Sequence, residues 1–253
     1  SVIGINTKKF NSQIISQIKN IEPDLELKIN EVSARLNLFT FSIDAKTVGT
    51  DLVYRNKTIK IENIKSQISL KSLIKDQFAL STIFISTKSI PLKDLINFIR
   101  LLKNDPKLYL AEQFIGKGYI VADIKLDFDK FGKVKNNFRI KGFVNDGQIS
   151  FLKKKLSKLN FNFEIIDNEF KLNDIKLLLN NKSINIPELT AVKQKDQFLV
   201  SGKIDSKNLS LQKEDIENFV NNDFLKFNVK EIIFSSKSEF SFKIDKNFKI
   251  KNL

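Results

Sequence analysis

The sequence predicts a mainly β protein, built as a long antiparallel meander with a few short helices. Three observations support this fold class. Apolar residues recur at every second position through most of the chain, turn-forming residues separate these runs at short intervals, and few stretches show helical spacing. Alternation places successive side chains on opposite faces of a strand, and closely spaced turns favour antiparallel neighbours.

The N-terminal part should open with a short amphipathic helix over 7–20, where Phe10, Ile14 and Ile18 are four residues apart. Pro23 ends this helix, and alternation begins at Leu25. Further strands are expected at 32–44, 51–55, 58–70 and 78–87. Residues 69–76 fit either one helical turn or a strand crossover.

A helical pair is expected over about 91–115. Leu95, Ile96, Ile99 and Leu102 follow helical spacing after Pro91, and these four side chains should face inward as the pair caps one end of the sheet. The pair is the best candidate boundary. It divides the chain into an N-terminal β-groove segment, 1–117, and a continuing antiparallel segment, 118–253.

The clearest alternation follows this boundary and supplies the candidate site. Apolar and mostly charged residues alternate through 118–128, and the pattern resumes after a turn and again in the next strand. One apolar face of the sheet is therefore expected to carry Ile120, Ala122, Ile124, Leu126, Phe128, Phe138, Ile140, Val144, Phe161, Phe163 and Ile165.

Beyond this stretch, alternation also marks 175–179, 198–200 and 240–244. Asp146-Gly147 is a hairpin-turn signal, because this pair accepts positive φ. Residues 211–222 have helical spacing, with Ile216, Phe219 and Val220 on one side.

Composition excludes much catalytic chemistry, because the chain has no His and no Cys. A Ser–His–Asp triad, a Cys nucleophile and a Cys/His zinc site are therefore impossible. Asp127 and Asp129 could together bind a cation, but with Asp123 they are better interpreted as solvated residues of a turn and a polar strand face. We expect no catalytic residues, no metal site, no cofactor and no enzymatic activity.

The net charge of +14 comes almost entirely from lysine. One explanation is a codon bias toward Lys, Asn, Ile and Phe. The other is attraction to an anionic surface, with lipid head groups favoured over nucleic acid because Arg and stacking aromatics are scarce. The basic run at 151–159 fits a solvated face or a protected edge strand, and head-group contact is the alternative.

No stretch has the apolar length of a membrane span. The opening residues "SVIGI" fit the trailing end of a span or signal segment, or a first strand. Because the sequence has no Met, we expect a fragment of a longer product or a processed chain.

The few expected helices cannot cover so large an apolar face. The sheet must either close on itself as a sandwich or barrel, or curl into a trough whose lining contacts something other than protein. The 23 Phe residues fit both solutions.

Several segments resemble the AsmA-like proteins of the bacterial envelope. The segments are "YRNKTIKIENIKSQISLKSLIKDQFALSTIFIS", "GYIVADIKLDFDKFGKVKNNFRIKGFVNDGQISF", "FNFEIIDNEFKLNDIKL" and "DQFLVSGKI", and "SVIGINTKKFNSQIISQI" is similar to the part that follows the family's membrane anchor. The resemblance covers most of the chain and rests on hydrophobic pattern and turn placement.

The resemblance implies a long, curved, open β-groove of a bridge-like lipid-transfer protein. Such proteins lie in the periplasm, are anchored in the inner membrane, and conduct phospholipid toward the outer membrane. The expected partners are then phospholipid acyl chains, an anionic membrane surface and other envelope proteins, with no nucleic acid. The alternative is a structural or assembly-assisting envelope protein with a closed β core and no ligand.

Overall fold

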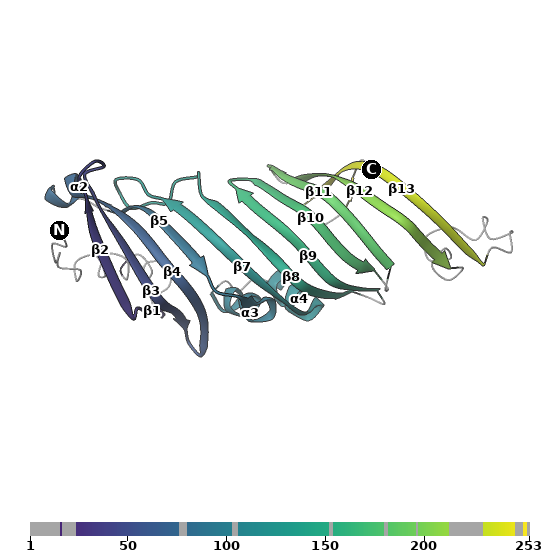
Figure 1. Cartoon of the computed structure of the whole chain (residues 1–253), viewed down its shortest axis with the longest axis horizontal. Coiled ribbons are helices and arrows are strands. Elements are labelled where there is room, and N and C mark those ends of the chain that lie inside the picture. Colours follow the sequence, from purple (N-terminus) through teal and green to yellow (C-terminus); the bar gives the residue numbers. More distant parts are fainter. Residues whose placement is uncertain are drawn as a thin grey trace.

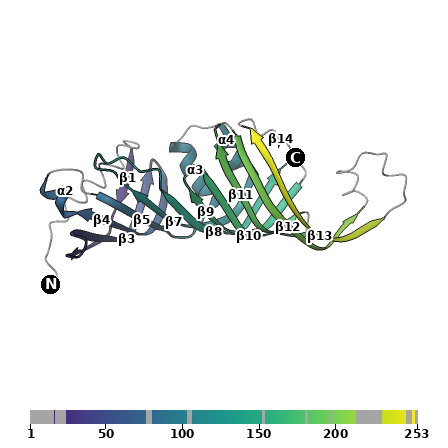
Figure 2. The ribbon, with the colours of Figure 1, turned by 90° about the horizontal axis from the view of Figure 1, so that it is seen from above.

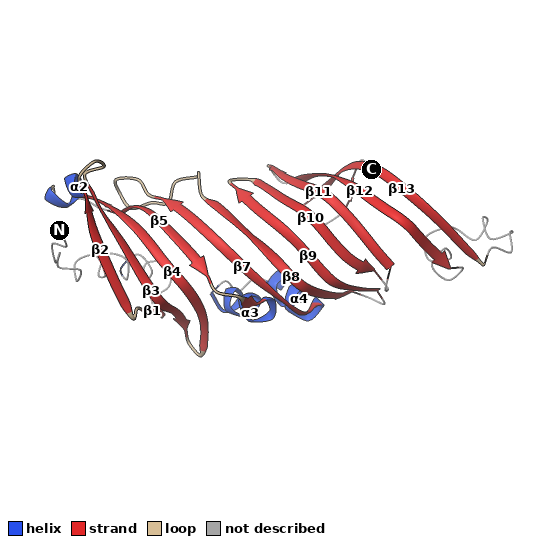
Figure 3. Ribbon diagram, in the orientation of Figure 1, coloured by secondary structure: helices blue, strands red, loops and turns tan. Residues whose placement is uncertain are grey.

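The computed structural model describes Ser16 and residues 24–75, 80–102, 106–151, 154–179, 182–195, 197–212, 230–245 and 250–251. These residues form one 14-stranded antiparallel sheet with a few short helices (Figures 1 and 3). The strand order follows the sequence almost throughout. The predicted fold class, a long antiparallel meander, is confirmed.

The N-terminal strands surround one long strand, β3 (Ser42–Tyr54). β1 (Leu25–Lys28) and β2 (Glu31–Asn37) both pair with one side of β3, and β4 (Lys57–Ser69) pairs with the other. The expected strand at 32–44 is wrong, because residues 38–41 form the β2–β3 turn and β3 continues without a gap. Polar residues such as Thr47 and Thr50 interrupt the apolar alternation, so the sequence pattern does not indicate one continuous strand.

One helical turn and two short strands follow. α2 (Leu70–Ile74) confirms the helical interpretation of 69–76. β5 (Leu80–Thr87) pairs with β4 and β7, and β6 (Ile90–Pro91) pairs with β7 (Ile115–Asp127). β7 crosses the expected boundary at residue 117, and it is paired on both sides, so the sheet is continuous there.

The helical pair consists of α3 (Leu92–Leu102) and α4 (Pro106–Phe114), and both lie on one side of the sheet (Figure 2). They pack on strands β3 to β8, in the middle of the sheet, and do not cap its end. Leu95 and Leu102 pack against the core as expected, Ile96 is half-buried, and Ile99 is exposed. The buried anchor is Phe98, whose ring meets Tyr54 edge to face at 6.4 Å.

The remaining strands each pair with their neighbours in sequence. They are β8 (Arg139–Phe151), β9 (Lys154–Ile166), β10 (Glu169–Leu179), β11 (Lys182–Gln194), β12 (Gln197–Gln212), β13 (Glu231–Asp245) and β14 (Ile250–Lys251).

Three expectations from the sequence concern one of these strands and two predicted helices. The basic run at 151–159 enters β9, which is paired on both sides, so its interpretation as an edge strand is wrong. The helix expected at 211–222 is wrong where it can be checked, since residues 211–212 end β12. Its remainder, and the helix at 7–20 apart from the helical Ser16, lie outside the described residues.

Asp146-Gly147 forms no hairpin turn, contrary to the sequence signal. The pair lies inside β8, at a register shift against β9, and Asp146 has φ 49°. Similar irregularities lie in β9 and β10, where Lys158 and Asp174 also have positive φ. The preference of Asp-Gly for positive φ therefore serves a β-bulge, which bends the strand and increases its twist.

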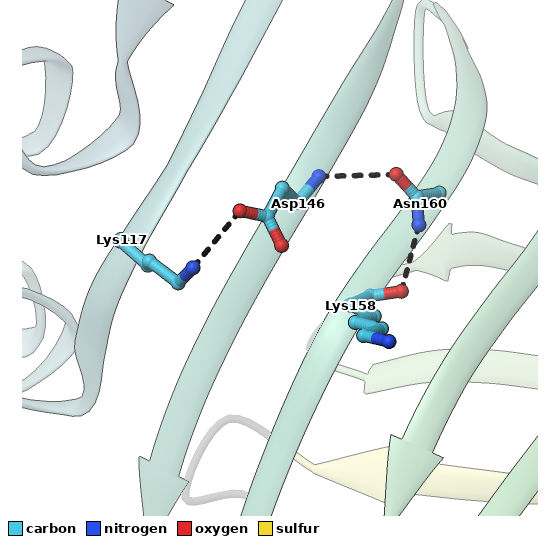
Figure 4. A network of polar contacts seen from close by, with 4 residues as sticks. All are labelled: Lys117, Asp146, Lys158 and Asn160. Carbon is cyan, nitrogen blue, oxygen red and sulfur yellow. Dashed lines mark hydrogen bonds and ion pairs between the residues drawn. The ribbon is translucent and has the colours of Figure 1, made fainter.

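A polar network joins the bulged regions of three adjacent strands (Figure 4). Lys117 Nζ on β7 donates to Asp146 Oδ2 at 2.9 Å, and the Asp146 N–H donates to Asn160 Oδ1 at 3.0 Å. Asn160 Nδ2 in turn donates to the Lys158 carbonyl at 2.7 Å. Bulges in successive strands curve the sheet in one direction. The sheet is thus an open, curved meander, and no described pairing joins the β1–β2 edge to the β14 edge.

Candidate functional site

An unbroken line of apolar residues crosses nine strands of the sheet. Each residue is the direct cross-strand partner of the next, from β4 to β13. We call this line the apolar row: Ile64, Ile85, Ile124, Ile140, Ile165, Phe170, Ala191, Val200 and Phe242. With strands about 4.8 Å apart, the row is about 38 Å long.

A second, parallel line runs beside the apolar row. It consists of Ala122, Gly142, Phe163, Leu172, Leu189, Gly202 and Phe240, again in direct cross-strand register. Two of its glycines lie beneath aromatic rings. A Cβ added to Gly142 would lie 2.9 Å from Cζ of Phe163, and one added to Gly202 would lie 2.7 Å from Cζ of Phe240. The missing side chains let the rings lie flat over the backbone.

The structure brings most of the sequence-predicted site residues together on this face. Ile120, Ala122, Ile124 and Leu126 follow one side of β7, and their partners on β8 and β9 continue the same side. Phe128 lies beyond the end of β7, is 8% exposed and belongs to the buried core. Phe138 is half-buried and immediately precedes β8.

The sequence-based list stopped at Ile165, but the apolar face continues to β13. The lining on β10 includes Phe170 and Leu172, then Ile175 and Leu177. The bulge at Asp174 changes the phase of the alternation from even to odd positions, so one uninterrupted pattern could not be read across it. The alternation at 198–200 and 240–244 could have extended the list of lining residues to β12 and β13.

Burial of the apolar face changes along the sheet. Ile64 is 5% exposed and belongs to a core that includes Phe98 of α3. Ile165, Phe170 and Leu189 are half-buried, whereas Phe163, Ile175 and Val200 are 9%, 5% and 7% exposed without belonging to that core. Among the described helices, none packs extensively on β9 to β13. The face is therefore a core covered by helices at β3 to β6, and at β9 to β13 it is a lining that no described helix covers.

Behind the apolar row, the opposite face of the sheet is mainly basic. Directly behind the apolar row, Lys46, Lys65, Phe84, Lys125 and Arg139 are successive cross-strand partners. Lys125 forms an ion pair with Asp127 at 3.3 Å, and Arg139 forms one with Glu164. The two faces thus separate apolar from charged side chains.

Asp127 and Asp129 have structural roles at the end of β7. Asp127 Oδ1 accepts from Thr82 Oγ1 at 2.8 Å, and its Oδ2 accepts from Asn137 Nδ2 at 2.9 Å. Burial raises the pKa of Asp127, but hydrogen bonds from Thr82, Lys125 and Asn137 outweigh burial and hold it below the usual value. Hydrogen bonds from the Lys133 and Phe131 N–H groups likewise lower the pKa of Asp129. In the described part of the chain, no cluster of three acidic residues could hold a metal ion.

Comparison with known proteins supplies no further identification. The sequence matches no protein-family model, no curated protein and no solved structure at a significant level. None of the helices that the structure describes is long and apolar enough to cross a membrane.

Proposed function

We propose that this protein is a non-enzymatic lipid-binding segment that conducts phospholipid along the apolar face of its sheet. The observation that carries the proposal is the apolar row, which continues over nine strands and is uncovered at β9 to β13. Large exposed apolar surfaces are rare in soluble proteins and mark binding sites when they occur.

The chemistry of the lining favours acyl chains. Each methylene that leaves water contributes about 0.8 kcal/mol without requiring a particular geometry. The two lines of lining residues carry only aliphatic side chains, Phe and Gly, so no polar side chain of theirs would hold a head group at one position. An acyl chain on such a face can slide between equivalent positions, as conduction requires.

The resemblance to AsmA-like proteins supports a setting for this activity. In our proposal the chain lies in the periplasm and is anchored in the inner membrane. It carries phospholipid between the inner and outer membranes, alongside other envelope proteins. No nucleic acid and no cofactor take part.

A second candidate is a structural or assembly-assisting envelope protein with a closed core. The observation that favours it is the buried cluster at β3 to β6, where Ile43, Ile64 and Ile68 are each at most 5% exposed. The two candidates differ in what touches the lining at β9 to β13. The first requires lipid there, and the second requires protein.

Photo-crosslinking distinguishes these candidates at two adjacent positions on β11. Leu189 belongs to the lining, and Glu188 faces the other side of the sheet, opposite Lys203. A photoreactive residue at Leu189 should capture phospholipid in cells, and the same residue at Glu188 should not. Exclusively protein adducts at Leu189, or equal lipid capture at both positions, would contradict the proposal.

A charge in the lining tests conduction itself. Leu189→Asp should slow phospholipid transfer between vesicles, because the carboxylate interrupts the apolar path. Its thermal unfolding should change little, since Leu189 is half-buried and water reaches it. Glu188→Gln is the matched control and should transfer lipid like the unmodified protein. Unchanged transfer by a folded Leu189→Asp variant would refute conduction along this face.

A further inference from the structure

Three neighbouring loops at one rim of the sheet carry exposed apolar side chains. They are the β2–β3 turn (38–41), the end of α2, and the β7–β8 loop (128–138). We call their exposed apolar residues the rim cluster: Leu38, Phe39, Phe41, Ile74, Phe131 and Val134. Relative exposure is 103% for Phe39, 79% for Ile74 and 74% for Phe131, so these side chains contribute almost nothing to the core.

The three loops lie at the same ends of the strands. The Leu70 N–H, at the start of α2, donates to the Phe41 carbonyl at 3.1 Å. The Phe128 N–H, at the start of the β7–β8 loop, donates to the Ser81 carbonyl of β5 at 2.9 Å. Figure 1 shows α2 at the end of the sheet where β2 finishes and β3 begins. The rim cluster therefore follows one rim of the sheet, from the β2–β3 turn to the β7–β8 loop.

Hydrogen bonds hold the loop tips in place. Asn37 Oδ1 accepts from the N–H groups of Phe39 and Thr40 at 3.2 and 3.3 Å. In the β7–β8 loop, Asp129 Oδ1 accepts from the N–H groups of Phe131 and Lys133 at 2.8 and 3.0 Å. The tips thus present their apolar side chains on ordered backbone.

Phe41 adopts a backbone conformation that is unfavourable for its side chain. Its φ is 49°, in the left-handed region that Gly and Asn tolerate and bulky residues avoid. It is also 57% exposed, so its own burial does not offset this strain. An aromatic residue at such a position indicates a role other than folding.

The charged residues around the rim cluster are mainly cationic. α2 and the turn after it expose Lys71 and Lys75, and the β7–β8 loop exposes Lys130, Lys133 and Lys135. The acid near the start of this loop, Asp129, accepts the loop's own N–H groups. Lys130 Nζ lies 4.9 Å from the ring centre of Phe131, so cation and aromatic ring share the tip.

We propose that the rim cluster docks on an anionic phospholipid bilayer, with its apolar side chains in the interfacial region and its lysines at the head groups. Apolar side chains flanked by lysines gain both from hydrophobic burial and from attraction to anionic lipid. A protein partner fits less well, because the cores of protein interfaces are depleted in Lys. This docking site is separate from the groove and does not depend on it.

Tryptophan fluorescence gives a direct test, because the protein contains no Trp. Phe131→Trp places the single fluorophore in the rim cluster, and Tyr109→Trp places it at an exposed position on α4. With vesicles containing phosphatidylglycerol, the emission of Phe131→Trp should shift to shorter wavelength and be quenched by lipids brominated in their acyl chains. Tyr109→Trp should show neither change. An unshifted, unquenched Phe131→Trp would overturn the proposal.

Vesicle flotation of the 253-residue chain measures the contribution of each group. Phe39→Ser with Phe131→Ser should weaken binding by about tenfold or more, while Tyr109→Ser should not change it. Lys133→Gln and Lys135→Gln should each weaken binding by about fivefold, and neutral phosphatidylcholine vesicles should bind poorly. Equal binding by all variants would refute the proposal. Self-association that the Phe39→Ser, Phe131→Ser variant abolishes, without vesicle binding, would instead assign the cluster to a second copy.

Discussion

The same sequence pattern has two structural outcomes in two regions of the sheet. Ile64 on β4 and Ile165 on β9 both belong to the apolar row. In both strands the apolar residues alternate with residues of the charged opposite face. Ile64 is 5% exposed, in a core with α3 and its neighbours, whereas Ile165 is half-buried. Alternation therefore determines which face is apolar, and a second layer determines whether that face becomes a core.

This difference matters for function because only an uncovered apolar face can exchange ligands. The covered half supplies stability, through closely packed Ile, Leu and Phe side chains. The uncovered half has the same chemistry without the covering layer. We infer that the covered half holds the sheet together while the uncovered half is free to bind.

The largest expected effect comes from placing a carboxylate at the covered end of the apolar row and, for comparison, at its middle. Ile64→Asp should lower the free energy of unfolding by about 4 kcal/mol or more, because it buries an unpaired charge. Ile165→Asp should lower it by only about 1 to 2 kcal/mol, because water reaches the carboxylate. Urea unfolding followed by far-UV circular dichroism measures both. Equal losses would show that both halves are closed cores.

The packing of α3 should produce the next largest effect. Phe98→Ala should cost about 3 to 5 kcal/mol, because Phe98 is 3% exposed and contacts Tyr54. Ile99→Ala, one residue along the same helix, should change stability by no more than about 0.5 kcal/mol. Thermal unfolding of the two variants tests which side of α3 covers the sheet. A greater loss for Ile99→Ala would reverse the assignment.

The sequence allowed the sheet, its antiparallel order and the helical pair to be predicted, since these depend on local periodicity and turns. The rotation of α3 could not be predicted. Apolar residues extend around much of this helix, so the stripes through Ile99 and through Phe98 fit the spacing equally well. In the structure the stripe through Phe98 faces the sheet, where its ring meets Tyr54 of β3.

Much of the candidate site was also predictable, and its omissions have a physical cause. Residues on β7 to β9 were found because their alternation is regular between bulges. Bulges such as those at Asp146 and Asp174 shift the phase by one residue, and a positive φ at Asp-Gly has the same sequence signal as a hairpin turn. The rim cluster was missed because isolated apolar residues in turns have no periodicity.

Glycines beneath aromatic rings give a smaller and more local test of the comparison. At Gly142, an added Cβ would overlap the Val121 carbonyl oxygen, which is backbone and cannot move aside. Gly142→Ala should therefore cost about 2 to 3 kcal/mol. At Gly202 the nearest obstacle is the ring of Phe240, half-buried in the uncovered lining, so Gly202→Ala should cost about 1 kcal/mol.

A double-mutant cycle identifies the obstacle at Gly202. Combining Gly202→Ala with Phe240→Ala should remove most of the cost of the alanine, because the ring no longer occupies its space. Stability of the four proteins, measured by urea unfolding, gives the coupling. Additive losses would mean that the backbone carbonyl of Glu188, 2.9 Å from the added Cβ, is the real obstacle.

The covered and uncovered halves also differ at their rims. Substitutions of the aspartates there should have the smallest effect on stability. Asp127 ends β7 with its side chain 13% exposed, held by Thr82 and Asn137. The corresponding β9–β10 turn begins with the exposed Asp167, whose φ is 51°, a conformation that Asn also tolerates. Asp127→Asn should therefore cost about 1 kcal/mol near neutral pH, and Asp167→Asn should change stability by less than about 0.5 kcal/mol.

The pH dependence of the stability lost in Asp127→Asn distinguishes the loss of the carboxylate charge from a steric effect of the amide. Hydrogen bonds hold the folded-state pKa of Asp127 below its ordinary value, so the carboxylate stabilises the fold fully above the unfolded-state pKa of about 3.9. That contribution disappears as the pH falls through the lower folded-state pKa. The stability difference between the unmodified protein and Asp127→Asn should therefore be constant from about pH 5 to 7 and shrink below about pH 4. A difference that persists unchanged at low pH would show that the amide fails for steric reasons, and that charge does not anchor this rim.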